Sequence, residues 1–169
     1  EQHQELPAFA NFGTQMTYSE FGQAAHHLAN AIYQQFGIQP GDRIALIMPN
    51  LLQYPVALYA SFLLGAIVVN CNPQYTADEL TEVLNDSGAK LVIALETSAH
   101  ALEASHLKHQ PQIILTTVGD LIKPRIKGIA INCVLRHLKK LVPSYHLPQA
   151  MTWTTLHNIT DPQPITPHP

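Results

Sequence analysis

The chain has 169 residues, of which 12% are charged and 46% are hydrophobic, and its formal net charge is −3. This composition excludes a disordered polyelectrolyte, which needs low hydrophobicity and high charge. It also predicts no membrane-spanning helix, because the longest apolar run, residues 54–69, is interrupted by Ser61 and Gly65 and stays short of the ~18 residues that a span needs. The length allows one domain with a substantial core.

Residues 1–120 alternate between strand and helix patterns. Segments 8–11 and 15–18 flank a Phe-Gly-Thr turn and predict a hairpin, after which Ser19 is the predicted N-cap of a helix that stops at Gly37. Short apolar runs predict buried strands at residues 43–48, 67–69, 90–95 and 111–116. Helices are predicted over 50–64 (starting near Pro55), from the capping box of Thr76 and Glu79 to Gly88, and from Thr97 or Ser98 to Lys108. Alternating strands and helices predict an α/β fold, with a parallel sheet flanked by helices on both faces.

The charge pattern changes after residue 120. Residues 1–120 carry eleven acidic and three basic side chains, whereas residues 121–160 carry six basic and no acidic ones. The six bases are Lys123, Arg125, Lys127, Arg136, Lys139 and Lys140. One helical stripe holds the apolar residues Ile126, Ile129, Ala130, Cys133, Val134, Leu138 and Leu141. We therefore predict a scaffold over 1–120, a basic amphipathic helix and connector over 121–160, and an extended Pro-rich tail over 161–169. The helix is weakened by Gly128 and ended by Pro143, and Trp153 follows in a short polar stretch.

Three interpretations of the basic helix stay open at this point. The six bases could dock on an anionic membrane surface, since each base near such a surface contributes roughly 1 kcal/mol. The apolar stripe could instead pack on its own domain, or meet another partner. Nucleic acid is disfavoured, because base stacking calls for aromatic residues among the bases, and Tyr145 and Trp153 lie beyond the basic run.

No catalytic, cofactor-binding or metal-binding residue is predicted from local patterns. The sequence has no phosphate-binding loop, no dinucleotide fingerprint and no nucleophile elbow. Cys71 follows a strand, but no base can be named for it. His100, His106 and His109, with Glu103 nearby, allow a metal site on a helix, although surface polarity explains these histidines more simply. Two cysteines make no disulfide framework and favour a cytoplasmic location.

Four segments together resemble acyl-CoA synthetases, and especially the bacterial long-chain fatty-acid–CoA ligases of the adenylate-forming superfamily. These segments are residues 41–58 (GDRIALIMPNLLQYPVAL), 64–80, 85–89 (NDSGA) and 141–148 (LVPSYHLP). The resemblance implies a partial N-terminal subdomain of an enzyme that uses ATP and Mg²⁺ to convert a long-chain fatty acid to an acyl-adenylate and then transfers the acyl group to CoA. It also implies that the family's phosphate loop and catalytic lysine lie downstream, so this piece alone is expected to be inactive.

The resemblance gives the basic helix a context, because enzymes of this kind are similar to peripheral proteins of the inner membrane face. The expected partners are the remainder of the ligase chain, the fatty acid as substrate of the whole enzyme, an anionic membrane surface, and a second copy that pairs with an exposed strand edge. The alternative is a self-contained, non-enzymatic module that binds a membrane surface or a protein.

Overall fold

The computed structural model describes residues 3–159, so the predicted tail over 161–169 lies outside the described residues. The strands are β1 (Pro7–Asn11), β2 (Thr14–Thr17), β3 (Arg43–Ile47), β4 (Ile67–Cys71), β5 (Leu91–Leu95), β6 (Gln112–Thr116) and β7 (Met151–Thr152). The α-helices are α1 (Tyr18–Phe36), α2 (Gln53–Leu63), α3 (Ala77–Ser87), α4 (Ala99–Glu103), α5 (Arg125–Cys133) and α6 (Trp153–Ile159). A 3₁₀ turn, η1 (Glu96–Ser98), precedes α4, and a π-helical segment, η2 (Val134–Leu138), continues α5.

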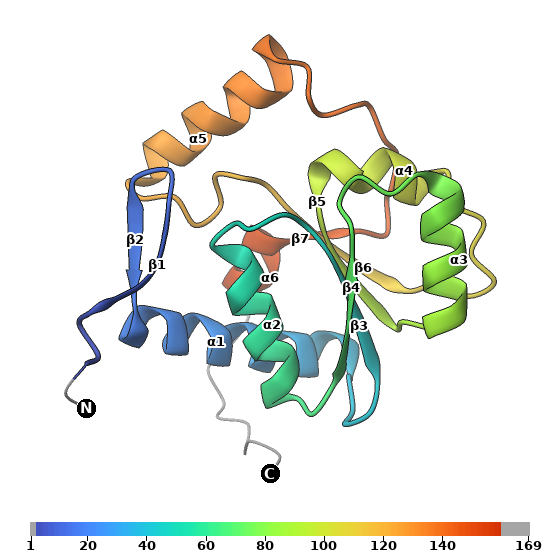
Figure 1. Cartoon of the computed structure of the whole chain (residues 1–169), viewed down its shortest axis with the longest axis horizontal. Coiled ribbons are helices and arrows are strands. Elements are labelled where there is room, and N and C mark those ends of the chain that lie inside the picture. Colours follow the sequence, from blue (N-terminus) through green and yellow to red (C-terminus); the bar gives the residue numbers. More distant parts are fainter. Residues whose placement is uncertain (1–2, 160–169) are drawn as a thin grey trace.

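A five-stranded sheet with the order β4-β3-β5-β6-β7 forms the centre of the molecule, and each neighbouring pair in it is parallel (Figure 1). β1 and β2 form the predicted hairpin beside it. Every residue of β5 is buried, as expected for a parallel strand covered on both faces. The predicted α/β fold class is confirmed.

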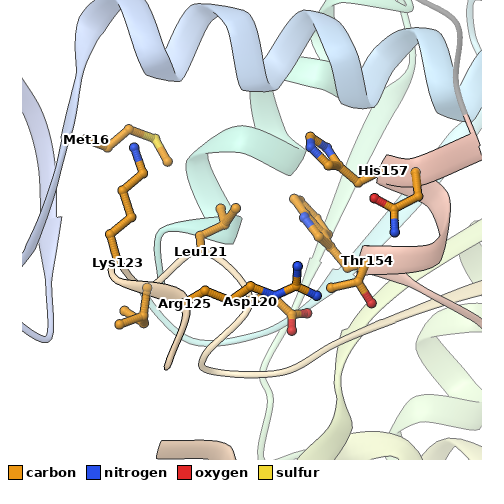
Figure 2. A pocket seen from close by; sticks show the side chains of 10 residues that line it. Met16, Asp120, Leu121, Lys123, Arg125, Thr154 and His157 are labelled. Atoms are coloured by element: carbon orange, nitrogen blue, oxygen red, sulfur yellow. The ribbon is translucent and has the colours of Figure 1, made fainter. Parts of the chain in front are cut away.

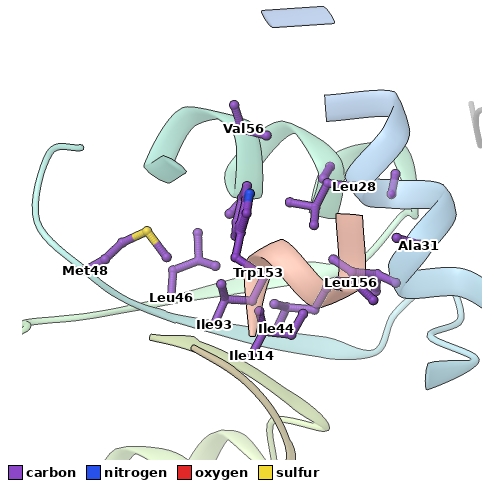
Figure 3. Close-up of a cluster of buried hydrophobic side chains, with 14 of the residues drawn as sticks. Leu28, Ala31, Ile44, Leu46, Met48, Val56, Ile93, Ile114, Trp153 and Leu156 are labelled. Carbon is purple, nitrogen blue, oxygen red and sulfur yellow. The ribbon is translucent and has the colours of Figure 1, made fainter. Parts of the chain in front are cut away.

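Successive strand side chains point to opposite faces of the sheet and fill two separate cores. Ile44 and Leu46 face α1, α2 and α6, whereas Ala45 and Ile47 face α3 and α4. Figure 3 shows the first core, in which strand residues meet Val56 of α2 and side chains of α1 and α6. Helices therefore cover both faces, as predicted.

Side-chain caps fix the starts of α1 and α3. Thr17, not the predicted Ser19, caps α1: the Glu20 N–H donates to Thr17 Oγ1 at 3.2 Å, and the Thr17 N–H donates to Glu20 Oε2 at 2.9 Å. This reciprocal pair is a capping box, which satisfies two free amides and so fixes an earlier start. The predicted capping box of Thr76 and Glu79 is confirmed at the start of α3.

Two helix boundaries differ from the predictions. α2 begins at Gln53, ahead of Pro55, and α4 ends at Glu103 instead of Lys108. Side chains of α3 accept hydrogen bonds from the backbone that follows α4. The His106 N–H donates to Thr81 Oγ1 at 2.9 Å, and the Lys108 N–H donates to Asn85 Oδ1 at 2.8 Å. These tertiary hydrogen bonds draw the backbone out of the helix.

The segment around Trp153 is part of the core, which the sequence pattern did not predict. Trp153 and Leu156 are 5% and 1% exposed, and they bring α6 onto the same face as α1. The two residues of β7, which directly precede Trp153, pair with β6.

The division of the chain at residues 120 and 160 stays a prediction. Within residues 3–159, no helix is long and apolar enough to cross a membrane.

Candidate functional site

The carboxyl ends of the parallel strands meet at one edge of the sheet, which is where open α/β sheets bind ligands. The chain passes from β3 to β4 on one side and then from β4 back across to β5 on the other side of β3, so the strand order reverses beside β3. α5 and η2 lie over this edge, at the end of the molecule where the tip of the β1–β2 hairpin also lies (Figure 1). We take the edge and the helix above it as the candidate site.

Asp120 organises the loop that leaves β6. It accepts hydrogen bonds at 2.9 Å from the Thr116 hydroxyl and from the Thr117 N–H, and it also accepts one from the Thr117 hydroxyl. Asn132 of α5 joins this network, because its Nδ2 donates to Thr117 Oγ1 at 2.8 Å and its Oδ1 accepts from the Gly119 N–H at 2.8 Å. The loop and the helix are thus hydrogen-bonded to each other through one side chain.

Two glycines allow the helix to approach the loop closely. A Cβ placed on Gly128 would lie 2.2 Å from the Gly119 carbonyl oxygen, and one on Gly119 would lie 2.2 Å from the Gly128 carbonyl oxygen. Neither position can hold a side chain without a shift of the backbone. Gly128 thus has a packing role, beyond the helix weakening that its low propensity predicts.

An ion pair joins η2 to the carboxyl end of β5. The Glu96 side chain is 3% exposed, and its carboxylate pairs with Arg136, whose side chain is 48% exposed. By accepting the Arg136 hydrogen bond and by its charge, Glu96 raises the pKa of Arg136. A carboxylate this deeply buried needs such a partner, because an unpaired buried charge is strongly destabilising.

Polar groups at this edge therefore hold a helix in place. Among the described residues, every buried side-chain nitrogen or oxygen has a hydrogen-bond partner. The sequence reasoning missed Glu96, Asp120 and Asn132 as members of one site. The position of Glu96 could have indicated a site residue, since it is an acid directly after a strand of buried apolar residues.

A cavity of about 280 Å³ lies between α6 and the loop before α5 (Figure 2). Met16, Leu121 and Trp153 contribute its apolar lining, and Lys123 and Arg125 bring cationic groups to it. Its volume is slightly below the ~300–1,000 Å³ of typical ligand pockets.

The six bases predicted for a membrane surface separate into two sets. Lys123 pairs with Glu20 at 2.6 Å, Lys127 Nζ donates to the Phe12 carbonyl oxygen at 2.5 Å, and Arg136 pairs with Glu96. The Lys123 hydrogen bond, followed by that of the Thr17 N–H, lowers the pKa of Glu20. The other set, Arg125, Lys139 and Lys140, makes none of these contacts, and all six bases are exposed.

The histidines of the metal hypothesis do not share a helix. α4 ends at Glu103, so His106 and His109 lie beyond it, and the His109 Nε2 lies 3.1 Å from the Ala89 carbonyl oxygen. Over residues 3–159, no three histidine, cysteine, aspartate or glutamate side chains are grouped as metal ligands. The predicted helical spacing of these histidines is therefore wrong.

The two cysteines differ in their surroundings. Cys71 is buried at the end of β4, and burial raises the pKa of its thiol to about 11. At neutral pH this thiol carries almost no thiolate, so Cys71 is a poor nucleophile. Cys133 is exposed on α5, and both cysteines are free.

Known proteins resemble this chain over most of its length. The sequence profile described as "AMP-binding enzyme" matches residues 1–135. The long-chain-fatty-acid–CoA ligase of Escherichia coli O6:H1 is 45% identical over 156 residues, which cover 91% of this chain and 28% of that protein. The ligase of the same name from Haemophilus influenzae is 39% identical over 162 residues, covering 94% of this chain and 28% of that protein. The chain thus spans little more than a quarter of the length of these relatives.

Solved structures agree with the fold. The N-terminal domain of FACL13 from Mycobacterium tuberculosis has a TM-score of 0.55 at 30% identity, over 68% of this chain and 30% of that one. A benzoate CoA ligase from Burkholderia xenovorans has a TM-score of 0.65 over 78% of this chain and 26% of that one, and at 23% identity it supports the fold alone. Because the profile matches most of the chain, the protein belongs to the family of AMP-binding enzymes.

Proposed function

We propose that this chain is the N-terminal β/α part of a long-chain fatty-acid–CoA ligase, which converts a fatty acid to an acyl-adenylate and then to an acyl-CoA. The observation that carries the proposal is the 45% identity across 91% of the chain to a protein of that name. The relatives are more than three times as long as the matched part, which supports a contribution to a larger enzyme.

The role of this part in our proposal is to build a scaffold. ATP, Mg²⁺ and CoA would serve the whole enzyme, but the carboxylates here do not fit a magnesium–nucleotide site. Asp120 is occupied by Thr116 and Thr117, and Glu96 is occupied by Arg136. We therefore route no step of the reaction through these residues.

A pyrophosphate-release assay with palmitate, ATP and CoA tests the proposal. The 169-residue chain alone is expected to release no pyrophosphate above a buffer blank, whereas the product of the longer reading frame is expected to turn over. Turnover by the 169-residue chain, or a longer product without activity on any fatty acid, would contradict the proposal. The second result would favour the self-contained binding module.

Location and self-association complete the proposal. We place the enzyme in the cytoplasm, because the two cysteines of the sequence make no disulfide framework of the kind found in oxidising compartments. A homodimer is supported by the outer edge of β4, which pairs only with β3 among the described strands. Sedimentation velocity at increasing concentration tests the dimer, and a constant monomer mass would contradict it.

A further inference from the structure

The cavity between α6 and the loop before α5 is lined by apolar side chains from three separate parts of the chain (Figure 2). Met16 comes from β2, Leu121 and Ile122 come from the loop, and Trp153 begins α6. Met16, Ile122 and Trp153 are 7%, 4% and 5% exposed, and they also belong to the first core. An apolar group in the cavity therefore meets side chains that packing already holds in place.

Hydrogen bonds hold the loop side of the cavity in place as well. The Lys123 N–H donates to Thr14 Oγ1 at 3.0 Å, and the Thr14 hydroxyl donates to the Lys123 carbonyl oxygen at 3.1 Å. Thr14 is 3% exposed on β2. The Ile122 N–H donates to the Gly119 carbonyl oxygen at 3.1 Å. The cavity is therefore preformed, which lowers the entropy cost of binding a ligand.

Two bases border the cavity, and only one of them is engaged in an ion pair. Lys123 pairs with Glu20 at 2.6 Å. Arg125 is exposed, and among residues 3–159 no carboxylate forms an ion pair with it. Figure 2 shows its side chain reaching into the space between the loop and α6. Arg125 thus offers an unengaged guanidinium to an anion in the cavity.

The acid in the lining is already occupied. Asp120 accepts hydrogen bonds at 2.9 Å from the Thr116 hydroxyl and from the Thr117 N–H. Its carboxylate therefore serves its own loop, and Lys123 and Arg125 leave the lining with a positive balance. Ligand pockets typically combine mostly apolar walls with a few polar groups that orient the ligand. This cavity has that composition, and its chemistry favours an anion that carries an apolar group.

The volume sets the size of the ligand. The cavity of about 280 Å³ holds roughly nine or ten non-hydrogen atoms, if each takes about the 30 Å³ of a water molecule in the liquid. A sixteen-carbon fatty acid is nearly twice that size. The long-chain acid proposed as the substrate of the whole enzyme is therefore too large for this cavity.

We propose that the cavity binds a small organic carboxylate. Its apolar part packs against Met16, Leu121 and Trp153, and its carboxylate pairs with the guanidinium of Arg125. Arginine suits this role, because its planar fork donates two parallel hydrogen bonds to a carboxylate. The site does not depend on the proposed ligase activity, since its ligand is smaller than the proposed substrate.

Trp153 is a built-in reporter of binding, because it lines the cavity and is the single tryptophan of the sequence. Cyclohexylacetate has ten non-hydrogen atoms and is the probe. At constant ionic strength we expect a saturable change in the Trp153 emission with a midpoint of about 1 mM. Acetate, which lacks the ring, should give no saturable change. The alcohol 2-cyclohexylethanol, which lacks the charge, should bind about tenfold more weakly.

Two results of this titration would overturn the proposal. One is the absence of a saturable change with cyclohexylacetate up to about 20 mM, well above the expected midpoint. The other is an equal midpoint for the acid and the alcohol, which would mean an apolar cavity without preference for an anion.

A matched pair of arginine variants tests the charge. Arg125→Gln is expected to weaken binding of the acid about tenfold and to leave binding of the alcohol unchanged. The control, Arg43→Gln, removes an exposed arginine at the start of β3 and should stay within about twofold of the wild type. Equal losses in the two variants would mean unspecific charge attraction and would contradict the role of Arg125.

A second pair tests whether the ligand lies in the cavity. Thr154 and Thr155 are both exposed on α6, and Thr154 lines the cavity whereas Thr155 is not among its lining residues. Thr154→Phe fills the space with a ring and should abolish the saturable change, while Thr155→Phe should keep the midpoint within about twofold. Circular dichroism of each variant verifies that the fold is retained. Unchanged binding by a folded Thr154→Phe variant would place the ligand elsewhere, and the proposal would fail.

Discussion

The helices that cover the sheet and the α5–η2 segment attach to the rest of the molecule in different ways. α1, α2 and α3 turn apolar side chains toward the strands, and much of the resulting core is inaccessible to solvent. α5 and η2 turn Gly128, Asn132 and Arg136 toward the body, together with the partly buried Ile131 and Leu135, and they leave most of their larger apolar side chains exposed. The comparison shows that an amphipathic pattern does not by itself say which side of a helix faces the protein. It also means that α5 and η2 depend on a few hydrogen bonds, each worth about 1 kcal/mol, and on the partial burial of Ile131 and Leu135.

Truncation of the same residue type in the two regions is expected to give the largest difference. Ile93 of β5 is 0% exposed and Ile126 of α5 is 76% exposed. Ile93→Ala should lower the free energy of unfolding by about 2–5 kcal/mol, because it leaves a cavity in the core. Ile126→Ala should stay within about 0.5 kcal/mol. Urea unfolding measures both, and a similar loss for the two variants would show that Ile126 is buried in solution.

Gly128→Ala tests whether the glycine contact or helix propensity dominates at α5. Propensity alone predicts a gain of about 1 kcal/mol for alanine in a helix. The 2.2 Å approach of a Cβ to the Gly119 carbonyl oxygen instead predicts a loss of about 1–3 kcal/mol, because the backbone must move. Hydrogen exchange over residues 125–138 should quicken while exchange in β5 stays slow. Slower exchange in the variant would contradict the close contact.

Arg136→Met removes the partner of a buried carboxylate. We expect a loss of about 1–2 kcal/mol, which is below the range for fully buried pairs because the Arg136 side chain is 48% exposed. The double variant Glu96→Gln with Arg136→Met should recover part of this loss, since no charge is then left buried. Thermal unfolding of the two variants checks this, and a double variant less stable than the single one would contradict it.

The smallest expected effect is on the pH dependence of stability, through His157 of α6, which contacts α1. Partial burial lowers the pKa of His157 from 6.5, and the nearby His27 lowers it further. The unfolded chain then binds a proton more readily than the folded one, so stability is lost as pH falls below about 6.5. His157→Gln should flatten this part of the stability profile between pH 7 and pH 5. An unchanged slope would show that His157 does not contribute to it.

The elements of the scaffold could be predicted because their signals are local. Buried strands appear as apolar runs, the capping box of Thr76 and Glu79 lies within four residues, and Gly37 ends α1 in the left-handed region with φ of 61°. The same local rule applies to Thr17 and Glu20, so the prediction of Ser19 as the cap is wrong. The sequence therefore predicts the fold class correctly, and it predicts most element boundaries to within a few residues.

The candidate site could not be predicted, because tertiary contacts decide it. The early end of α4 depends on Thr81 and Asn85, which lie in another helix. The orientation of α5 depends on Gly119 and Gly128, and glycine carries no hydrophobic signal. β7 has only two residues, too few for any periodicity. The apolar stripe was visible in the sequence, but its outward direction became known only from the partners of the inner face.

β7 and α6 also bear on the order in which the protein can assemble during synthesis. The strands β3 to β6 are joined by single crossovers, so they can pair as soon as residue 116 has emerged. β7 reaches β6 only after residues 117–150, including α5, have been made, and this is the longest connection between consecutive strands of the sheet. Closing a longer loop slows such contacts. Until Trp153 and Leu156 arrive, the part of the first core that they cover remains open, and a nascent chain at this stage exposes apolar surface that chaperones can bind.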